Sequence, residues 1–166
     1  LSAHPFVVEL PPGTYRLTVE RGKEYFPLTH QVTLDQKPLQ TEFTLHRWID
    51  MGERGWYSGD THVHRTLEEL PNCMLAEDLN VTFPLLYWES RAFAAPRNSP
   101  RSFTGQIDPK PIRADDTHVI YPRNTEYEIG RVGDKRHTLG AFFVLNHRTV
   151  FDLGVPARRP ATDPVD

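Results

Sequence analysis

Residues 57–64 read Tyr-Ser-Gly-Asp-Thr-His-Val-His and divide a chain of 166 residues into two parts with different patterns. Side chains alternate between the two faces of a β-strand, so a strand here places His62 and His64 on the same face. Asp60, two residues earlier, shares that face. The histidines come directly before a polar turn and a predicted helix, where α/β folds carry their active sites. The segment therefore predicts a functional strand at the start of an α/β domain.

A helix and a second strand are predicted to follow. Apolar residues recur close to helical spacing within residues 66–80. Pro71 is tolerated only in the first turn of a helix, so the helix should begin near it. Residues 83–88 form an apolar run too short for an amphipathic helix and typical of a buried strand. Strand, helix and strand in this order predict a parallel pair.

The rest of the second part is predicted to hold a long loop and further strands. Residues 91–114 are rich in Pro, Arg and Ser without periodicity, which indicates a loop. Strands are predicted at 118–121, leading into 125–132, and at 137–146. The tail, 155–166, holds three prolines and little apolar content. We expect it to be disordered or to lead into a continuation of the chain.

The first fifty residues alternate with a period of two, as strands do. Proline and glycine turns at roughly ten-residue spacing bound these segments, which is typical of an antiparallel sheet or sandwich. The predicted strands are 6–10, 15–19, 31–34 and 41–45. We therefore predict a β-sandwich-like module over residues 1–49 and a second domain over 55–166. Residues 10–17 also resemble the hairpin of carboxypeptidase-regulatory-like accessory modules, which implies a spacer or a carbohydrate-proximal module and, with it, export as a secreted or periplasmic protein.

Composition limits the classes of partner and of site. A net charge of -3 and a pI near 6.2 lack the basic field that nucleic acids or anionic membranes attract, so neither is an expected partner. No run approaches the length of a membrane-spanning helix. The single cysteine excludes an internal disulfide and a cysteine-rich zinc site. Any metal site must therefore use histidine and carboxylate ligands.

Three groups of side chains are candidate ligands. Two imidazoles on one strand face, as at His62 and His64, can hold one cation, and Asp60 is placed to orient a histidine or to bind the metal itself. Glu126 and Glu128 share a face of the strand predicted at 125–132, and a carboxylate can bridge two cations. His147 ends an apolar strand that His137 begins, and is the stronger candidate of the two. The alternatives are a surface strand with two histidines, an edge strand with two solvated glutamates, and a satisfied core histidine.

Residues 56–64, Trp-Tyr-Ser-Gly-Asp-Thr-His-Val-His, resemble the first motif of the PHP (polymerase and histidinol phosphatase) superfamily, particularly its CehA/McbA-type metallohydrolases. In that type a β accessory module often precedes the PHP domain. The resemblance covers about residues 55–153. It implies a distorted (β/α) barrel with two or three divalent metals, in which His62 and His64 are ligands. It also implies that Glu126, or failing that Glu128, is the bridging carboxylate, and that His147 is the histidine ending a later barrel strand.

Two departures from the family pattern matter. The second family motif is normally Thr-Asp-His-Asn after an apolar strand, but residues 85–90 here read Leu-Leu-Tyr-Trp-Glu-Ser. Glu89 would be an unusual substitute for the missing histidine. The later barrel strands and their ligands would lie beyond Asp166, so we expect about half of a barrel and an incomplete metal site. The predicted fold is thus α+β or α/β, a β-sandwich-like module followed by an incomplete PHP-type (β/α) barrel.

Two functions follow as hypotheses. The first is a metal-dependent hydrolase of ester, amide, carbamate or phosphoester bonds in a small-molecule or polymer-derived substrate. Zinc or manganese would activate water, and Asp60 would orient a histidine or shuttle a proton. The second is a catalytically degenerate PHP-like binding or scaffold protein that associates with carbohydrate. The two differ at residues 88–89: Glu89 pointing into the same cavity as His62 and His64 would be compatible with catalysis, whereas Trp88 filling that cavity would exclude it.

Overall fold

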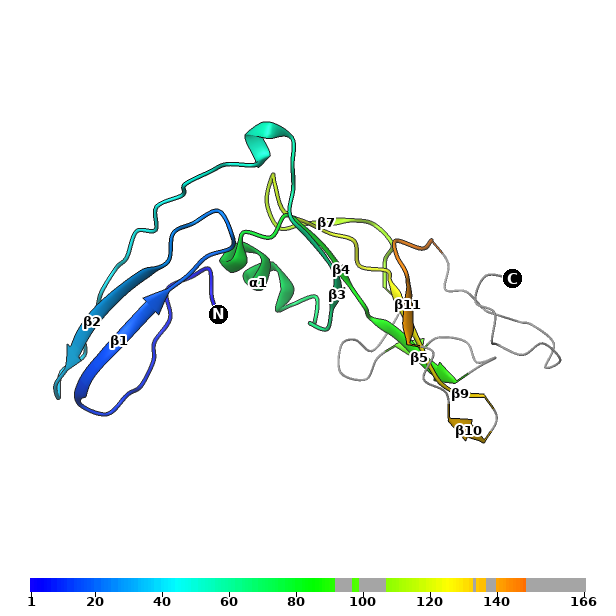
Figure 1. The fold of residues 1–166 in the computed structure, drawn as a ribbon, viewed down its shortest axis with the longest axis horizontal. Helices are drawn as coiled ribbons and strands as arrows, with labels where there is room; N and C mark the ends of the chain where they lie inside the picture. Colours follow the sequence, from blue (N-terminus) through cyan, green and yellow to red (C-terminus); the bar gives the residue numbers. More distant parts are fainter. Residues whose placement is uncertain (92–96, 99–106, 133, 137–139, 149–166) are drawn as a thin grey trace. The chain divides into compact units, whose positions relative to one another are not determined.

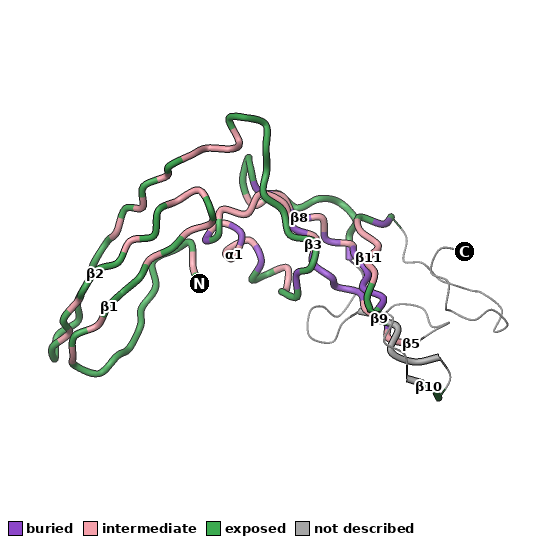
Figure 2. The backbone as a smooth tube through the Cα atoms, in the orientation of Figure 1, coloured by how far each residue is buried: buried purple, intermediate pink, exposed green. Residues whose placement is uncertain are grey.

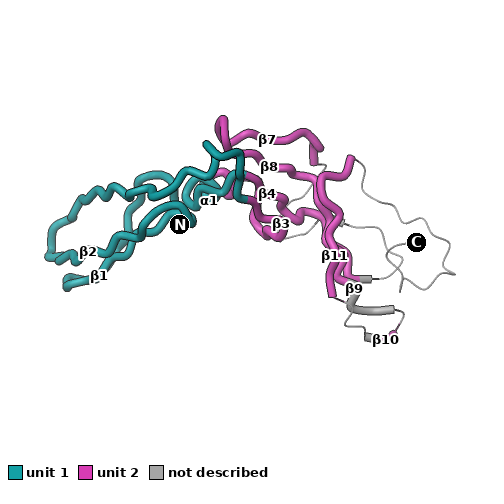
Figure 3. The backbone as a smooth tube through the Cα atoms, turned by 45° about the horizontal axis from the view of Figure 1, so that its top comes forward, with its two compact units in different colours: residues 1–58, 72–80 teal, residues 59–71, 81–166 magenta. Residues whose placement is uncertain are grey.

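The computed structural model describes residues 1–91, 97–98, 107–132, 134–136 and 140–148, and it is a mixed α/β structure with far more strand than helix (Figure 1). The chain divides into two compact units (Figure 3). Unit 1 contains Leu1–Ser58 and Asn72–Asn80, and unit 2 contains Gly59–Pro71 and Val81–Asp166. His137 and the predicted tail at 155–166 lie outside the described residues. No helix in the described residues has the length and apolarity needed to cross a membrane.

Unit 1 is built on one antiparallel ribbon. Strands β1 (Gly13–Val19) and β2 (Leu28–Leu34) pair from Gly13 opposite Leu34 to Val19 opposite Leu28, which confirms the predicted strands at 15–19 and 31–34. The predicted strands at 6–10 and 41–45 are wrong, because neither segment is a strand. None of residues 1–58, all of which are described, is buried (Figure 2). The period-two pattern is therefore present without the second sheet that would make a sandwich.

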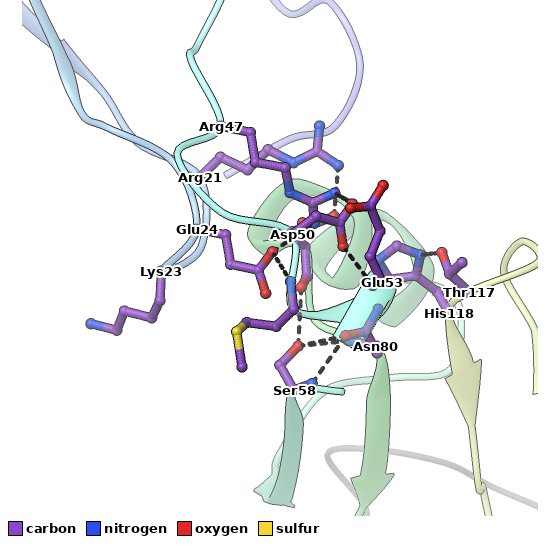
Figure 4. A network of polar contacts seen from close by, with 12 residues as sticks. Arg21, Lys23, Glu24, Arg47, Asp50, Glu53, Ser58, Asn80, Thr117 and His118 are labelled. Atoms are coloured by element: carbon purple, nitrogen blue, oxygen red, sulfur yellow. Dashed lines mark hydrogen bonds and ion pairs between the residues drawn. The ribbon is translucent and has the colours of Figure 1, made fainter. Parts of the chain in front are cut away.

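A network of charges organises the rest of unit 1 (Figure 4). Arg47 forms ion pairs with Asp78 at 2.6 Å, with Asp50 at 2.7 Å and with Glu24 at 3.0 Å. Arg21 binds the other oxygen of Asp78 at 3.0 Å. Burial alone would lower the pKa of Arg47, but its acidic neighbours, Asp78 first among them, raise it above its ordinary value. The network joins three distant segments of the chain, and the short helix η1 (Gly52–Arg54) follows it.

The first sheet of unit 2 begins with the strand predicted around residue 60. Its order is β3-β4-β8-β7, in which β3 (Gly59–Val63) and β4 (Val81–Pro84) are parallel. This confirms the predicted parallel pair. Strand β8 (Val119–Ile120) is parallel to β4, and β7 (Ile112–Arg113) pairs with β8 in the antiparallel sense.

The connection from β3 to β4 contains α1 (Leu70–Glu77), the one α-helix in the described part of the chain, which begins one residue before Pro71 and so confirms the predicted start. Thr66 and Glu69, just before the helix, form two reciprocal hydrogen bonds at this start. The Glu69 N–H donates to the Thr66 hydroxyl at 3.2 Å, and the Thr66 N–H donates to the Glu69 carboxylate at 3.4 Å. This reciprocal pair is a capping box, which satisfies backbone donors that a helix start leaves without partners.

The second sheet of unit 2 has the order β10-β9-β5-β6, with β11 also paired to β9. Strand β9 (Thr125–Val132) has the predicted bounds, and it pairs in parallel with β5 (Tyr87–Arg91) and antiparallel with β11 (Ala141–Val144). The short strands β6 (Arg97–Asn98) and β10 (Lys135–Arg136) complete the sheet. Both sheets are open in the described part of the chain, so no closed barrel forms there (Figure 1).

The core of unit 2 lies where the chain passes from one sheet to the other. Leu85 and Leu86 are fully buried between β4 and β5. Leu86 and Tyr87 pack with Ile107, and Leu67 covers them in part. The predicted strand at 83–88 is therefore two strands in different sheets, separated by these two leucines.

Candidate metal centre

An irregularity in β3 lies beside the two histidines, of which His62 is in the strand and His64 directly follows it. The register with β4 shifts between Asp60 and Val63. At this irregularity the His62 N–H donates to the Asp60 carboxylate at 2.9 Å. The carboxylate thus accepts the hydrogen bond that a neighbouring strand would otherwise accept. Bulges of this kind re-aim side chains next to functional sites. The described contact of Asp60 with His62 is therefore to its backbone and not to its imidazole ring.

The two imidazoles converge on one carboxylate. The Nε2 atoms of His62 and His64 are 3.1 Å apart, and both face Glu126 on β9. The carboxylate of Glu126 is 3.3 Å from Nε2 of His64 and 3.7 Å from Nε2 of His62. Among the described residues, these three side chains form the one group that could hold a metal ion.

The donor atoms have the spacing and chemistry of a coordination sphere. Zinc bonds to nitrogen and carboxylate oxygen of roughly 2.0–2.1 Å place neighbouring tetrahedral ligands about 3.3 Å apart. The observed separations of 3.1 and 3.3 Å are close to that value, and 3.7 Å is slightly longer. Two imidazoles and one glutamate are also a ligand set of catalytic zinc sites, which keep a position open for water. The residues therefore fit a divalent cation.

Exposure of the group is uneven. The histidine side chains are 51% and 52% exposed, whereas that of Glu126 is 7% exposed. The carboxylate of Glu126 is therefore enclosed, whereas both imidazoles are open to solvent. Phe143 on β11 supports the group, because its ring meets that of His62 edge to face at 4.8 Å. Sequence reasoning missed Phe143, since only the register of β11, which places it opposite Glu126, brings it to the site.

The register of β5 and β9 separates the remaining candidates by sheet face. Trp88 lies opposite Glu126 and shares its face, whereas Glu89 lies opposite Tyr127 on the other face. Burial, and then the charge of Glu89, raises the pKa of Tyr127 to about 12. Glu128 is on the same strand face as Glu126 but is exposed, and it lies outside the His-His-Glu group. Glu89 is therefore not positioned to replace the missing histidine.

His147 lies apart from the group. Its Nε2 is 2.9 Å from the Thr125 hydroxyl, and its ring is 5.8 Å from that of Tyr87. Thr125 and Tyr87 are opposite each other on the face that Glu126 does not share. These are the contacts of a packed core histidine, and the assignment of His147 as a ligand or catalyst stays a prediction.

Comparison of the chain with protein-family models, curated proteins and solved structures finds no match.

Proposed function

We propose that the chain belongs to a metal-dependent hydrolase and that His62, His64 and Glu126 hold its divalent metal. The observation that carries the proposal is the convergence of two imidazole Nε2 atoms and one buried carboxylate within a few ångströms. A bound divalent cation lowers the pKa of water toward about 7 and polarises a carbonyl or phosphoryl oxygen. Ester, amide, carbamate and phosphoester bonds are the substrate class that this chemistry serves.

Each residue has a distinct part in the proposal. His62 and His64 supply neutral nitrogen ligands, which suit zinc and manganese alike. Glu126 supplies the anionic ligand, and its burial between neighbouring strands fixes its position. Asp60 holds the His62 backbone through the 2.9 Å hydrogen bond, so that the two rings stay convergent. The PHP-type barrel remains part of this proposal, supported by the residue 56–64 motif and by the parallel β3–β4 unit.

Elemental mass spectrometry of the purified protein tests the metal site. We expect near-stoichiometric zinc, manganese or iron in the wild type and little in the double variant His62→Ala, His64→Ala. His30→Ala, His46→Ala is the matched control, because it removes two exposed histidines of unit 1 and should leave the metal content unchanged. Equal, negligible metal in all three proteins would rule the site out.

Activity is tested separately on the metal-loaded protein with ester, amide, carbamate and phosphoester substrates. Turnover that Glu126→Gln reduces, while the fold persists by circular dichroism, would support a hydrolase. A second candidate function is metal binding without catalysis in a degenerate PHP-like scaffold. The register that places Trp88 opposite Glu126 favours it, because an indole on that face would compete for the space that a further ligand would need. Stoichiometric metal without turnover of any substrate class would select this second function.

A further inference from the structure

The candidate metal ligands come from strands of different sheets. His62 lies in β3 and His64 directly follows it, whereas Glu126 lies in β9. In the described part of the chain β3 and β9 do not pair, so no ladder of hydrogen bonds sets the distance from the histidines to the carboxylate. A binding site needs its groups held to within about 0.5 Å of the productive geometry. Other contacts must therefore fix the separation of the two strands.

One peptide group at the end of β4 is hydrogen-bonded toward both ligand-bearing segments. Its N–H, from Leu85, donates at 2.9 Å to the carbonyl oxygen of Val63, the residue between the two histidines. Its carbonyl oxygen, on Pro84, accepts a hydrogen bond from Nδ2 of Asn124 at 2.9 Å. Asn124 in turn stands just before β9, in which Glu126 is the second residue. A short path with two hydrogen bonds therefore joins the histidine pair to the glutamate.

The side chain of Asn124 is fully buried, and its partners require an amide. Nδ2 donates a second hydrogen bond to the carbonyl oxygen of Tyr121 at 2.6 Å, and Oδ1 accepts the N–H of Asn146 at 2.8 Å. Two carbonyl partners and one N–H partner need a group with two donors and one acceptor, which an asparagine side chain supplies. An ionised aspartate has nearly the same shape but no donor. The chemistry of this position is therefore specific for asparagine.

We propose that Asn124 is a positioning residue of the metal centre, which holds Glu126 at the distance from His62 and His64 that a divalent cation requires. The inference rests on the proposed metal site and adds to it a residue that binds neither metal nor substrate. Removal of the groups that orient metal ligands lowers metal affinity by about 10- to 100-fold. We expect a loss of that order when residue 124 can no longer donate to Pro84.

Isothermal titration of the folded protein with zinc, well below the unfolding temperature, tests the proposal. Asn124→Asp keeps the shape and removes both donors, and its zinc affinity should fall by about 10- to 100-fold. Asn124→Ala buries no charge, should show a loss of the same order, and replaces Asn124→Asp if that variant does not fold. Thr125→Val is the matched control, because it removes the buried 2.9 Å hydrogen bond to His147 on the strand face that Glu126 does not share. It should lose stability in urea but keep its zinc affinity.

The visible absorption of bound Co²⁺ separates a change of coordination geometry from general destabilisation. We expect an altered spectrum in the Asn124 variants and the wild-type spectrum in Thr125→Val. In the metal-free protein, hydrogen exchange should show that the Leu85 N–H loses protection in the Asn124 variants and keeps it in Thr125→Val.

The outcomes separate this inference from the metal site on which it rests. Wild-type zinc affinity and Co²⁺ spectrum in both Asn124 variants would overturn the role of Asn124 and leave the metal site standing. An equal loss of affinity in Thr125→Val would assign the effect to stability and would overturn that role as well. A wild type that binds neither zinc nor cobalt would overturn the metal site itself, and the positioning role with it.

Discussion

At the scale of single residues, Asp115 shows how one carboxylate can fix a tight turn. It accepts the backbone N–H groups of Thr117 and His118, each at 2.8 Å, and it binds Nδ1 of His118 at 2.8 Å. Burial alone would raise the pKa of Asp115, but these hydrogen bonds outweigh it and lower the pKa to about 2. The turn joins β7 to β8 and so helps to hold the edge of the first sheet of unit 2.

This depressed pKa predicts a loss of stability in acid. The folded-state pKa lies below the ordinary value of about 3.9, so the contribution is fully present above pH 4 and is lost as the pH falls toward 2. Because the Asp115 side chain is 43% exposed, we expect only about 1 kcal/mol or less. Urea unfolding between pH 2 and 6 should show Asp115→Asn destabilised near pH 6 and equal to wild type near pH 2. Asp116→Asn is the control, and an equal effect there would contradict the assignment.

Asp60 leads to a second prediction at this scale, which rests on the metal site. Asp60→Ala removes the acceptor for the His62 N–H and frees the bulge, so we expect zinc affinity to fall by about tenfold, the worth of one net hydrogen bond. Asp60→Asn keeps a side-chain oxygen and should bind nearly as tightly as wild type. Isothermal titration with zinc measures both.

Asp35→Ala is the matched control for Asp60→Ala. It removes a similar local hydrogen bond, from the Lys37 N–H at 2.7 Å, at a place remote from the histidines in sequence and in the other unit. Unchanged zinc affinity in Asp60→Ala would mean that the bulge holds His62 without help from the carboxylate.

The residues of the candidate site were predictable to different degrees. His62 and His64 follow from the local alternation alone, because one lies in β3 and the other directly follows it. The strand pattern does not separate Glu126 from Glu128, and the family resemblance prefers Glu126; the contact with His64 shows that Glu126 is the one that reaches the histidines. Partners of this kind depend on register between strands far apart in sequence, which local patterns do not encode.

At the scale of elements, the capping box of α1 has a measurable role. Glu69→Ala removes the carboxylate that accepts the Thr66 N–H, and Thr66→Ala removes the hydroxyl that accepts the Glu69 N–H. We expect each change to cost about 1 kcal/mol of unfolding free energy. Glu68→Ala is the matched control, since this exposed neighbour carries the same charge outside the box. Equal losses in Glu68→Ala and Glu69→Ala, measured by urea unfolding, would assign the effect to charge.

Elements were predictable where local pattern and tertiary context agree. Strand β9 and the start of α1 match their predictions, because one has a continuous strand pattern and the other a first-turn proline and a capping box. The apolar run 83–88 was predicted as one strand, but it belongs to two. Leu85 and Leu86 are buried where the chain passes from one sheet to the other, so the apolar pattern continues across the break. Residues 6–10 and 41–45 alternate as strands do but lack a partner strand within the chain described.

At the scale of the whole molecule, the two units should respond differently to metal. All three candidate ligands belong to unit 2. A ligand that binds only the folded state stabilises it by about 2.7 kcal/mol when its free concentration is about 100 times the dissociation constant. For a unit of about 100 residues, this corresponds to a rise in Tm on the order of 10 °C.

In differential scanning calorimetry, added zinc or a chelator should therefore shift the unfolding transition of unit 2 and leave that of unit 1 in place. The shift should be absent in His62→Ala, His64→Ala and present in His30→Ala, His46→Ala, whose changes lie in unit 1. Hydrogen exchange should locate the added protection in β3, in His64 directly after it and in β9, and not in the β1–β2 ribbon. Protection confined to the ribbon would place the metal on unit 1 and contradict the site, because all three candidate ligands lie in unit 2.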